Sequence, residues 1–502
     1  MSASLVGSEM CIRDRDNANA LQNRRFVGVK ETLIYGFANG GQCMSYTFMS
    51  SWLVYFFVSV FKIAPEAVSF MIFVVGIWDT INDPLMGSII DRTRTRFGKL
   101  RPWLLIVPIP LALATVMLFS GPELLADEPV NSVKRIVYMY VSYIIWELFY
   151  TIGDVPFWGL SASISPNPKE RTAAITSARF ISSILGGLPG IVISPLIDLA
   201  KDGKIDVPLH TMFFIMGLVV SIVGMAIFSL AGIFVKERVV SLSDEPKFTD
   251  SMRFLFKNKP LLMIILSNVL GALGGIGGIF STYYYIDVLG SATVSLFIGI
   301  PGTIVGFISY LMIPYFKKRW DNRQIMILTG LYTAAIPIAV YFVGIKFASN
   351  MWVIAPVLAL QGALTGIVSA IRMVVPTEMI ADTVDYMEWK TGKRNEGMAF
   401  SVLTFVGKLS GSIQKSIGTA LLGASFVGYV IVQGVDHVPQ SDATKAWIWA
   451  FFTIIPAVLG LLGIVPYLAY DLVGDKLKKI RDDLDARRVA VVKAENDGKA
   501  GE

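Results

Sequence analysis

Two carboxylates one helical turn apart are the residues of this chain with the clearest capacity for chemistry. Asp79 and Asp83 lie in the apolar run WDTINDP at positions 78–84. The i, i+4 spacing places both acids on one helix face, with Asn82 beside them. Carboxylates inside a membrane span are costly, so they usually mark an ion or proton path. A soluble buried helix with two capping acids is the alternative interpretation.

Composition indicates a membrane environment for these acids. Of the 502 residues, 54% are hydrophobic and only 16% are charged, and the mean hydropathy is +0.60. Soluble domains carry roughly 25% charged residues. Apolar windows of about 20 residues follow one another, separated by short charged loops. The pattern predicts an all-α membrane protein. The net charge of +6 comes from basic residues in loops, so it does not indicate nucleic-acid binding.

The lengths of the apolar windows predict twelve membrane spans. The spans are expected to begin near Glu31, Pro65, Pro102, Arg135, Glu170, Leu209, Pro260, Ala292, Asn322, Met351, Glu396 and Ala446. We divide the chain into an N-terminal six-helix half (29–236), a polar cytoplasmic linker (237–258), a C-terminal six-helix half (259–474) and a charged cytoplasmic tail (475–502). Transporters are often built from two such halves, with the binding site between them near mid-membrane.

The first 28 residues form a leader before the first span. Residues 1–15 share no pattern with the rest of the chain, and SLVGSEMCIRD within them resembles a translated sequencing-adapter tail. We interpret residues 1–15 as an assembly artefact, which leaves the native start open.

Lysine and arginine set the predicted orientation. One set of loops is rich in both, and the opposite loops hold few. Because basic loops are retained in the cytoplasm, both termini and the linker are expected inside. The basic loops lie near 24–25, 92–101, 169–171, 236–238, 317–323 and 393–394.

Several enzyme classes lack their signatures here. The two cysteines exclude a disulfide framework and a cysteine-based metal site. No nucleotide-binding GxxxxGK[ST] motif is present, and neither HExxH nor a Ser/His/Asp arrangement is visible. We therefore expect no enzyme activity and no cofactor, and an energy source other than ATP.

Several stretches resemble a known transporter family. GSIIDR at 87–92, with the arginine-rich run after it, is similar to the loop signature of the major facilitator superfamily. IWDTINDPLMGSIIDRTRTRFGKLRPW at 77–103 resembles, more specifically, the glycoside–pentoside–hexuronide:cation symporters, the group that includes melibiose permease. YTIGDVPFW, KERTAAITSARF and ADTVDYMEWKTGKRNEGMAFSV, which begin at 150, 169 and 381, agree with this. The resemblance implies the major facilitator fold, with 12 transmembrane helices in two halves.

The resemblance also implies a cation site. Thr151 and Asp154 in the fourth span are three residues apart and share a face. In the family these positions, with those of Asp79, Asn82 and Asp83, hold the coupling sodium ion. A dehydrated cation needs several oxygen ligands and negative charge, which these five residues offer. Na⁺ is therefore favoured over a proton. Structural ion pairs between the acids and basic residues are the alternative.

A stripe on the fourth span suits a sugar. Tyr150, Asp154 and Trp158 follow one another at i, i+4 and i+8. A carboxylate can accept hydroxyl hydrogen bonds while an indole covers the apolar face of the ring. Arg179 lies in an apolar region and needs a partner, for which Asp154 is the natural choice. The resemblance places both on the sugar. Core or lipid packing of Trp158 and a purely structural Asp154–Arg179 pair remain alternatives.

Thr404 and Lys408 in the eleventh span are also one turn apart. The resemblance places both on the substrate side of the second half, whereas a solvated or snorkelling lysine is the alternative. Arg372 in the tenth span is a further candidate for substrate binding. It could instead pair with Glu378 or with a carbonyl group.

One departure from the family concerns the first span. Galactoside-transporting relatives carry a Lys-Asp pair there, whereas this chain has Gln42-Cys43. One anion of the sugar site is therefore missing. Because the cations Arg179, Arg372 and Lys408 would then face fewer acids, we hypothesise a negatively charged sugar such as a hexuronide.

Gates are predicted at the cytoplasmic ends of the spans. Asp382, Asp385 and Glu388 recur every three residues and, with Arg394, could form ion pairs between the halves that break on opening. Asp91 and Arg92 are interpreted in the same way. For the basic loop after Asp91, the alternative is topology alone.

Together these observations predict a monomeric transporter of the bacterial cytoplasmic (inner) membrane. Its mechanism would be alternating access with symport of a cation, Na⁺ before H⁺, and a glycoside, pentoside or hexuronide. The expected partners are the sugar, the coupling cation and the lipid bilayer. The rivals are a proton-coupled carrier of a non-sugar solute or lipid and a membrane sensor that transports nothing.

Overall fold

Helix is the dominant secondary structure of the protein. The computed structural model describes residues 25–238, 258–392 and 396–500. Within these ranges it contains no named strand, and the one β-bridge joins Thr95 to Gly98. The prediction of an all-α membrane protein is confirmed. A helix satisfies its own backbone hydrogen bonds, which a lipid environment requires of any spanning segment.

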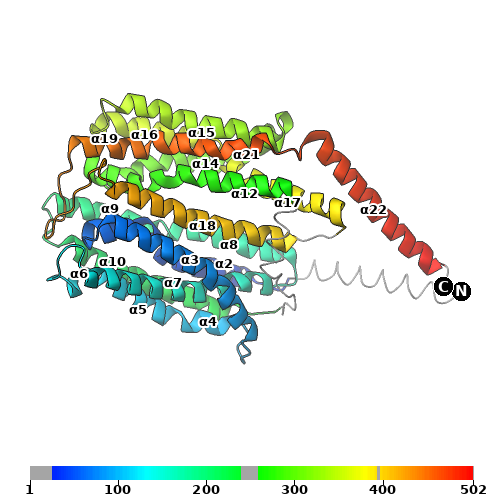
Figure 1. Ribbon diagram of the computed structural model, residues 1–502. Coiled ribbons are helices and arrows are strands. Elements are labelled where there is room, and N and C mark those ends of the chain that lie inside the picture. The colour runs from blue at the N-terminus through cyan, green and yellow to red at the C-terminus, as the bar shows by residue number, and fades with distance from the viewer. Residues whose placement is uncertain (1–24, 239–257, 393–395, 501–502) are drawn as a thin grey trace.

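The long helices of the N-terminal half run along a common direction (Figure 1). All the elements of this half, long and short, are α2 (Val29–Tyr55, continued by the π-helical η1, Phe56–Val60), α3 (Pro65–Arg92), α4 (Arg101–Ile106), α5 (Pro108–Phe119), α6 (Gly121–Leu124), α7 (Val133–Ser163), α8 (Pro168–Leu185), α9 (Leu188–Lys201) and α10 (Leu209–Phe234).

The C-terminal half continues the bundle, and α22 extends away from it (Figure 1). The elements are α12 (Lys259–Ala272), η2 (Leu273–Ile276), α13 (Gly277–Tyr283), η3 (Tyr284–Val288), α14 (Val294–Arg319), α15 (Asn322–Gly344), α16 (Met351–Gly366), α17 (Ser369–Thr391), α18 (Glu396–Gly423), α19 (Asp442–Phe452), α20 (Ile454–Leu461), η4 (Leu462–Ile464), α21 (Val465–Leu468) and α22 (Gly474–Ala500).

Ten helical segments of the described chain are long and apolar enough to cross a membrane. Two further segments match predicted spans. The first is α4 with α5, of which α5 has only 12 residues, and the second is α18, with 28 residues. The total of twelve spans and the boundaries of the two halves stay predictions.

Glycines let helices approach closely at two places in the bundle. A Cβ atom at Gly41 of α2 would lie 2.4 Å from the carbonyl oxygen of Gly224 on α10. A Cβ atom at Gly463 would lie 2.7 Å from Cα of Gly271. The glycine run of the seventh span therefore packs α12 directly against the last span, and its 3₁₀ turn η2 interrupts the helix there.

The fold brings α3 and α18 together along their length (Figure 1). Ser69 of α3 donates a hydrogen bond to the carbonyl oxygen of Ser416 (2.8 Å). One side of Gly76 is closed by Ser412, because a Cβ atom there would lie 2.2 Å from the Cβ atom of Ser412. This contact joins the predicted halves and places the acids of α3 opposite the lysine of α18.

The charged tail forms the helix α22 and docks on the end of α17. Arg481 donates to the buried Asp382 (2.6 Å), and Trp389 donates to Asp483 (3.0 Å). Asp382 thus pairs with the tail of its own half, whereas the sequence predicted a pair between the halves. The tail supplies a nearby guanidinium that residue spacing within the tenth span could not reveal.

Candidate functional site

A cavity of about 420 Å³ lies between α2, α3, α7 and α18. We call it the central cavity. Acids reach it from the N-terminal half, and lysines reach it from the C-terminal half. Its ionisable lining residues are Tyr46, Asp79, Tyr143, Glu147, Tyr150, Asp154, Lys408 and Lys415.

Lys408 holds the two acids of α3. Its Nζ atom lies 3.3 Å from Oδ2 of Asp79 and forms a closer ion pair with Asp83. Asp79 and Asp83 share a face, as their spacing predicted. The alternative of structural ion pairs describes this geometry, since an ammonium group takes the place between the acids. The three side chains are 22–34% exposed, so water screens the pair only in part.

The other predicted cation ligands lie around this pair. The Thr151 hydroxyl donates to Oδ1 of Asp79 (3.4 Å), which links α7 to α3. Asn82 is buried, and its Nδ2 atom has no hydrogen-bond partner among the described residues. Asp79 thus contacts Thr151 directly and is joined to Asp83 through Lys408. Asp79 and Asp154 line the central cavity, whereas Asn82, Asp83 and Thr151 do not.

Gln42 is the partner of Asp154. Its Nε2 atom donates to Oδ1 of Asp154 (3.0 Å), and its own Oε1 atom is buried without a partner. The position at which this chain departs from the family pattern therefore contacts the central acid. A neutral amide here donates to Asp154 and adds no charge of its own.

Arg179 does not pair with Asp154. Its guanidinium lies over the ring of Trp158, with Cζ 4.3 Å from the ring centroid. No carboxylate is bonded to it within the described residues. The predicted Asp154–Arg179 pair is wrong for this structure, because Gln42 takes the carboxylate and the indole face takes the cation. Trp158 and Arg179 lie outside the lining of the central cavity.

Aromatic rings form one wall of the central cavity. Tyr150 stacks on Trp146, with ring centroids 5.2 Å apart, and on Tyr46, with centroids 5.0 Å apart. Tyr150 and Asp154 thus supply the flat surface and the acceptor that the sequence predicted. The indole that lines the cavity is that of Trp146, whereas Trp158, which the sequence predicted, does not line it.

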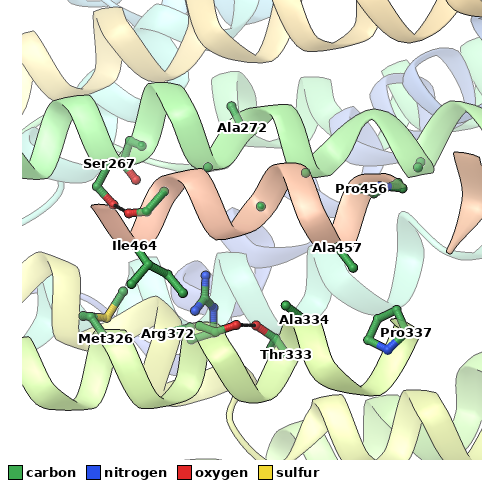
Figure 2. Close-up of a pocket in the computed structure, with 18 of the residues that line it drawn as sticks. Ser267, Ala272, Met326, Thr333, Ala334, Pro337, Arg372, Pro456, Ala457 and Ile464 are labelled. Atoms are coloured by element: carbon green, nitrogen blue, oxygen red, sulfur yellow. Dashed lines mark hydrogen bonds between the residues drawn. The ribbon is translucent and has the colours of Figure 1, made fainter. Parts of the chain in front are cut away.

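The candidate substrate-binding residues of the C-terminal half do not all line the same cavity. Lys408 reaches the central cavity, and the exposed Thr404 lies one turn before it on α18 without lining the cavity. Arg372 lies in a different cavity, within the C-terminal half (Figure 2). Glu378, one of the alternative partners considered for Arg372, forms an ion pair with Lys317.

Two charged residues of the central cavity, Glu147 and Lys415, were not predicted from the sequence. Glu147 precedes Asp154 by seven residues on α7, and Lys415 follows Lys408 by seven on α18, so each pair shares a face. The carboxylate of Glu147 accepts a hydrogen bond from Tyr143 (2.7 Å). Both residues line the central cavity about 10 Å from the Lys408 level. A charged residue inside an apolar span is a signal that could have found them.

The remaining predicted gate residues are Asp91, Arg92, Asp385, Glu388 and Arg394. Arg92 is exposed, and Asp385 and Glu388 lie on α17 near the tail helix. The side chain of Asp91 and the whole of Arg394 lie outside the described residues.

The predicted halves also contact each other at the end of the bundle away from α22. Asp198 at the end of α9 accepts hydrogen bonds from the Ser291 hydroxyl (2.6 Å) and from the backbone nitrogens of Ala292 (2.7 Å) and Thr293 (2.9 Å). Lys201 donates to the carbonyl oxygen of Ile286 (2.8 Å). In the loop beside these contacts, burial lowers the pKa of the His437 imidazole. The bundle is thus joined at the end away from α22.

Known proteins match nearly the whole chain. A family described as MFS/sugar transport protein matches residues 34–473. The inner membrane symporter YicJ of Escherichia coli (strain K12) is 29% identical over 470 residues, which are 91% of this chain and 95% of YicJ. The isoprimeverose transporter of Lactiplantibacillus pentosus is 27% identical over 474 residues, 93% of each chain.

A solved structure agrees in fold. The inward open xylose transporter XylE of E. coli superposes with a TM-score of 0.58 at 13% identity, over 90% of this chain and 98% of XylE. With the matched family and the ten apolar helices, this defines an integral membrane protein of the major facilitator fold. The chain belongs to the MFS sugar transport family, and the predicted resemblance to glycoside–pentoside–hexuronide symporters is confirmed. It is a transporter and not an enzyme.

Proposed function

We propose that this protein is a sodium-coupled symporter of a glycoside, pentoside or hexuronide. The observation that carries the proposal is the ion-pair group of Asp79, Asp83 and Lys408, of which Asp79 and Lys408 line the central cavity. Two carboxylates and the Thr151 hydroxyl form an oxygen-rich site suited to a small hard cation. YicJ is itself called a symporter, and the isoprimeverose transporter is named for a sugar.

Coupling would work because Na⁺ takes the place of the Lys408 ammonium group between the two acids. Lys408 and Na⁺ both carry a single positive charge, so Na⁺ can replace the ammonium group between the acids without changing the net charge. Lys408 would then be released toward the cavity and the sugar. Because Lys408 comes from the C-terminal half and both acids from the N-terminal half, the exchange would alter a contact between the halves.

Sugar recognition would use the aromatic wall beside Asp154. The stacked rings of Tyr150 and Trp146 offer flat apolar surface, and Asp154 offers an acceptor for hydroxyl groups. A hexuronide carboxylate would have to meet Lys408 or Lys415, because Arg372 does not line this cavity.

Alternating access would use the two ends of the bundle. The contacts of Asp198 and Lys201 would break and re-form at one end as the halves rock. By the distribution of basic loops, this end faces outward and both termini face the cytoplasm of a bacterial inner membrane. The conformation would then be open to the inside.

Uptake into membrane vesicles tests the proposal. A panel of radiolabelled neutral glycosides, pentosides and uronides is offered with a sodium gradient or with potassium alone. We expect sodium to stimulate uptake of at least one sugar, and the variant Asp83→Cys to lose this stimulation. Asp442→Cys, which changes a fully exposed acid at the start of α19, is the matched control and should behave like the parent. Sodium stimulation that survives in Asp83→Cys contradicts the assignment.

Proton coupling is the second candidate, and Glu147 is the observation that favours it. Its carboxylate lines the central cavity and bonds to Tyr143, away from the Lys408 pair. A carboxyl group in such a place can carry a proton across the membrane. If uptake follows an imposed pH gradient without sodium and Glu147→Gln abolishes it, the coupling ion is H⁺. Sodium-driven uptake that persists in Glu147→Gln supports Na⁺.

A further inference from the structure

A second cavity, of about 640 Å³, lies inside the C-terminal half between α12, α15, α17 and α20 (Figure 2). We call it the second-half cavity. It shares no lining residue with the central cavity. Glycines open it, because Gly271 and Gly274 of the seventh span and Gly460 of α20 place no side chains in it. Its volume falls in the range of about 300–1,000 Å³ that is typical of small-molecule sites.

Arg372 is the only charged residue on the lining of the second-half cavity. Its Nη1 atom lies against α15, since a Cβ atom added at Gly330 would be 3.3 Å away. Figure 2 shows the guanidinium between α15 and the segment of Ile464. No acid lines the cavity, and Arg372 has no ion-pair partner within the described residues. The Arg372 side chain is exposed, and a guanidinium without a counter-charge inside a membrane bundle is typical of a functional site.

Gln361 is the second unsatisfied group of this lining. Its Oε1 atom is buried and has no hydrogen-bond partner among the described residues. The Nε2 atom of the same amide is not among the buried unpartnered atoms, so it is the end of the side chain that can donate to a ligand hydroxyl. The cavity therefore offers a planar cationic donor on α17 and an amide donor on α16.

We propose that the second-half cavity binds a hydroxylated organic anion. Its carboxylate or phosphate group would pair with Arg372, and a neighbouring hydroxyl would accept a hydrogen bond from Nε2 of Gln361. Guanidinium groups bind both kinds of anion in a bidentate manner. This ligand chemistry has two sources, a soluble sugar acid and the headgroup of an anionic lipid such as phosphatidylglycerol. The site goes beyond the proposed symport, because no residue of the cation site takes part.

Binding to the purified full-length protein tests the site. Glucuronate and neutral glucose are titrated calorimetrically in a non-ionic detergent. In a second arm, nanodiscs of phosphatidylglycerol or phosphatidylcholine are compared by the midpoint of thermal unfolding. We expect glucuronate to bind or phosphatidylglycerol to raise the midpoint, and the neutral counterparts to do neither. Arg372→Gln should weaken the anion affinity by about 10- to 100-fold. The arm that responds identifies the source.

A pair of glycine variants keeps the test valid if Arg372→Gln does not fold. A Cβ atom at Gly278, which lines the second-half cavity, meets nothing within 4 Å, so Gly278→Leu fills the space without an immediate clash. Gly299→Leu on α14 is the matched control, since its Cβ atom also meets nothing and it lies outside the cavity. Loss of anion binding in Gly278→Leu alone supports the site. If the parent binds neither anion, or if Arg372→Gln or Gly278→Leu binds like Gly299→Leu, the proposal is wrong.

Discussion

The two cavities of this transporter differ in how their charges are balanced. In the central cavity, Asp79 and Asp83 of one predicted half are paired with Lys408 of the other. In the second-half cavity, Arg372 stands without a counter-charge inside one half. A charge pair that spans two moving halves can be broken and re-formed during transport, whereas a lone charge inside one half keeps its surroundings. The central cavity is therefore suited to coupling, and the second-half cavity to static binding of an anion.

Of the variants that test this difference between the cavities, a change at Lys408 should have the largest effect on uptake. Lys408→Met leaves two neighbouring carboxylates without their ammonium group and removes the contact between the halves. We expect the initial rate of sugar uptake to fall by about 100-fold, because breaking a partly buried pair costs several kcal/mol. Lys445→Met, on the exposed first turn of α19, should leave the uptake rate unchanged. Equal rates for the two variants would show that the pair has no role in coupling.

Gln42 should give an intermediate effect. Gln42→Ala removes the amide that donates to Asp154 and leaves a carboxylate short of one hydrogen bond. The loss of a bond to a charged group predicts an apparent sugar affinity about tenfold weaker. The concentration dependence of uptake measures this, with Gln433→Ala in an exposed loop as the control. An unchanged affinity in Gln42→Ala would separate Asp154 from sugar recognition.

Arg179 should give the smallest effect. Arg179→Gln removes a cation–π contact with Trp158, which is worth about 0.5–1 kcal/mol at exposed sites. We expect uptake to fall by about two- to fivefold, with its sodium dependence unchanged. A loss as large as that of Lys408→Met, with altered sodium dependence, would restore the predicted pair with Asp154.

The fold was largely predictable, because a lipid environment leaves an apolar run of about 20 residues little choice but a helix. The face shared by Asp79 and Asp83 was also predictable, since i, i+4 spacing fixes it. The contacts between side chains on different helices were not predictable. Arg179 was assigned to Asp154 because both needed a counter-charge, but helix spacing does not show that Gln42 reaches Asp154 first.

Other misses have equally local reasons. Asp382 pairs with Arg481 of α22, a segment that the sequence identified only as a charged cytoplasmic tail. Arg372 shares its span with the gate residues, and only the packing of α15 and α20 shows which cavity it faces. Glu147 was visible as an acid in an apolar span, and the same argument that identified Asp79 would have identified it.

Sodium binding to the purified protein is the most direct test of the central claim that Na⁺ and Lys408 compete for the two acids. Isothermal titration with NaCl, at constant ionic strength in choline chloride, should give a saturable binding heat for the parent protein. The account predicts no such heat for Asp83→Cys and a tighter sodium affinity for Lys408→Met, because the competing ammonium group is gone. A sodium affinity in Lys408→Met equal to or weaker than that of the parent, or saturable binding that persists in Asp83→Cys, would contradict it.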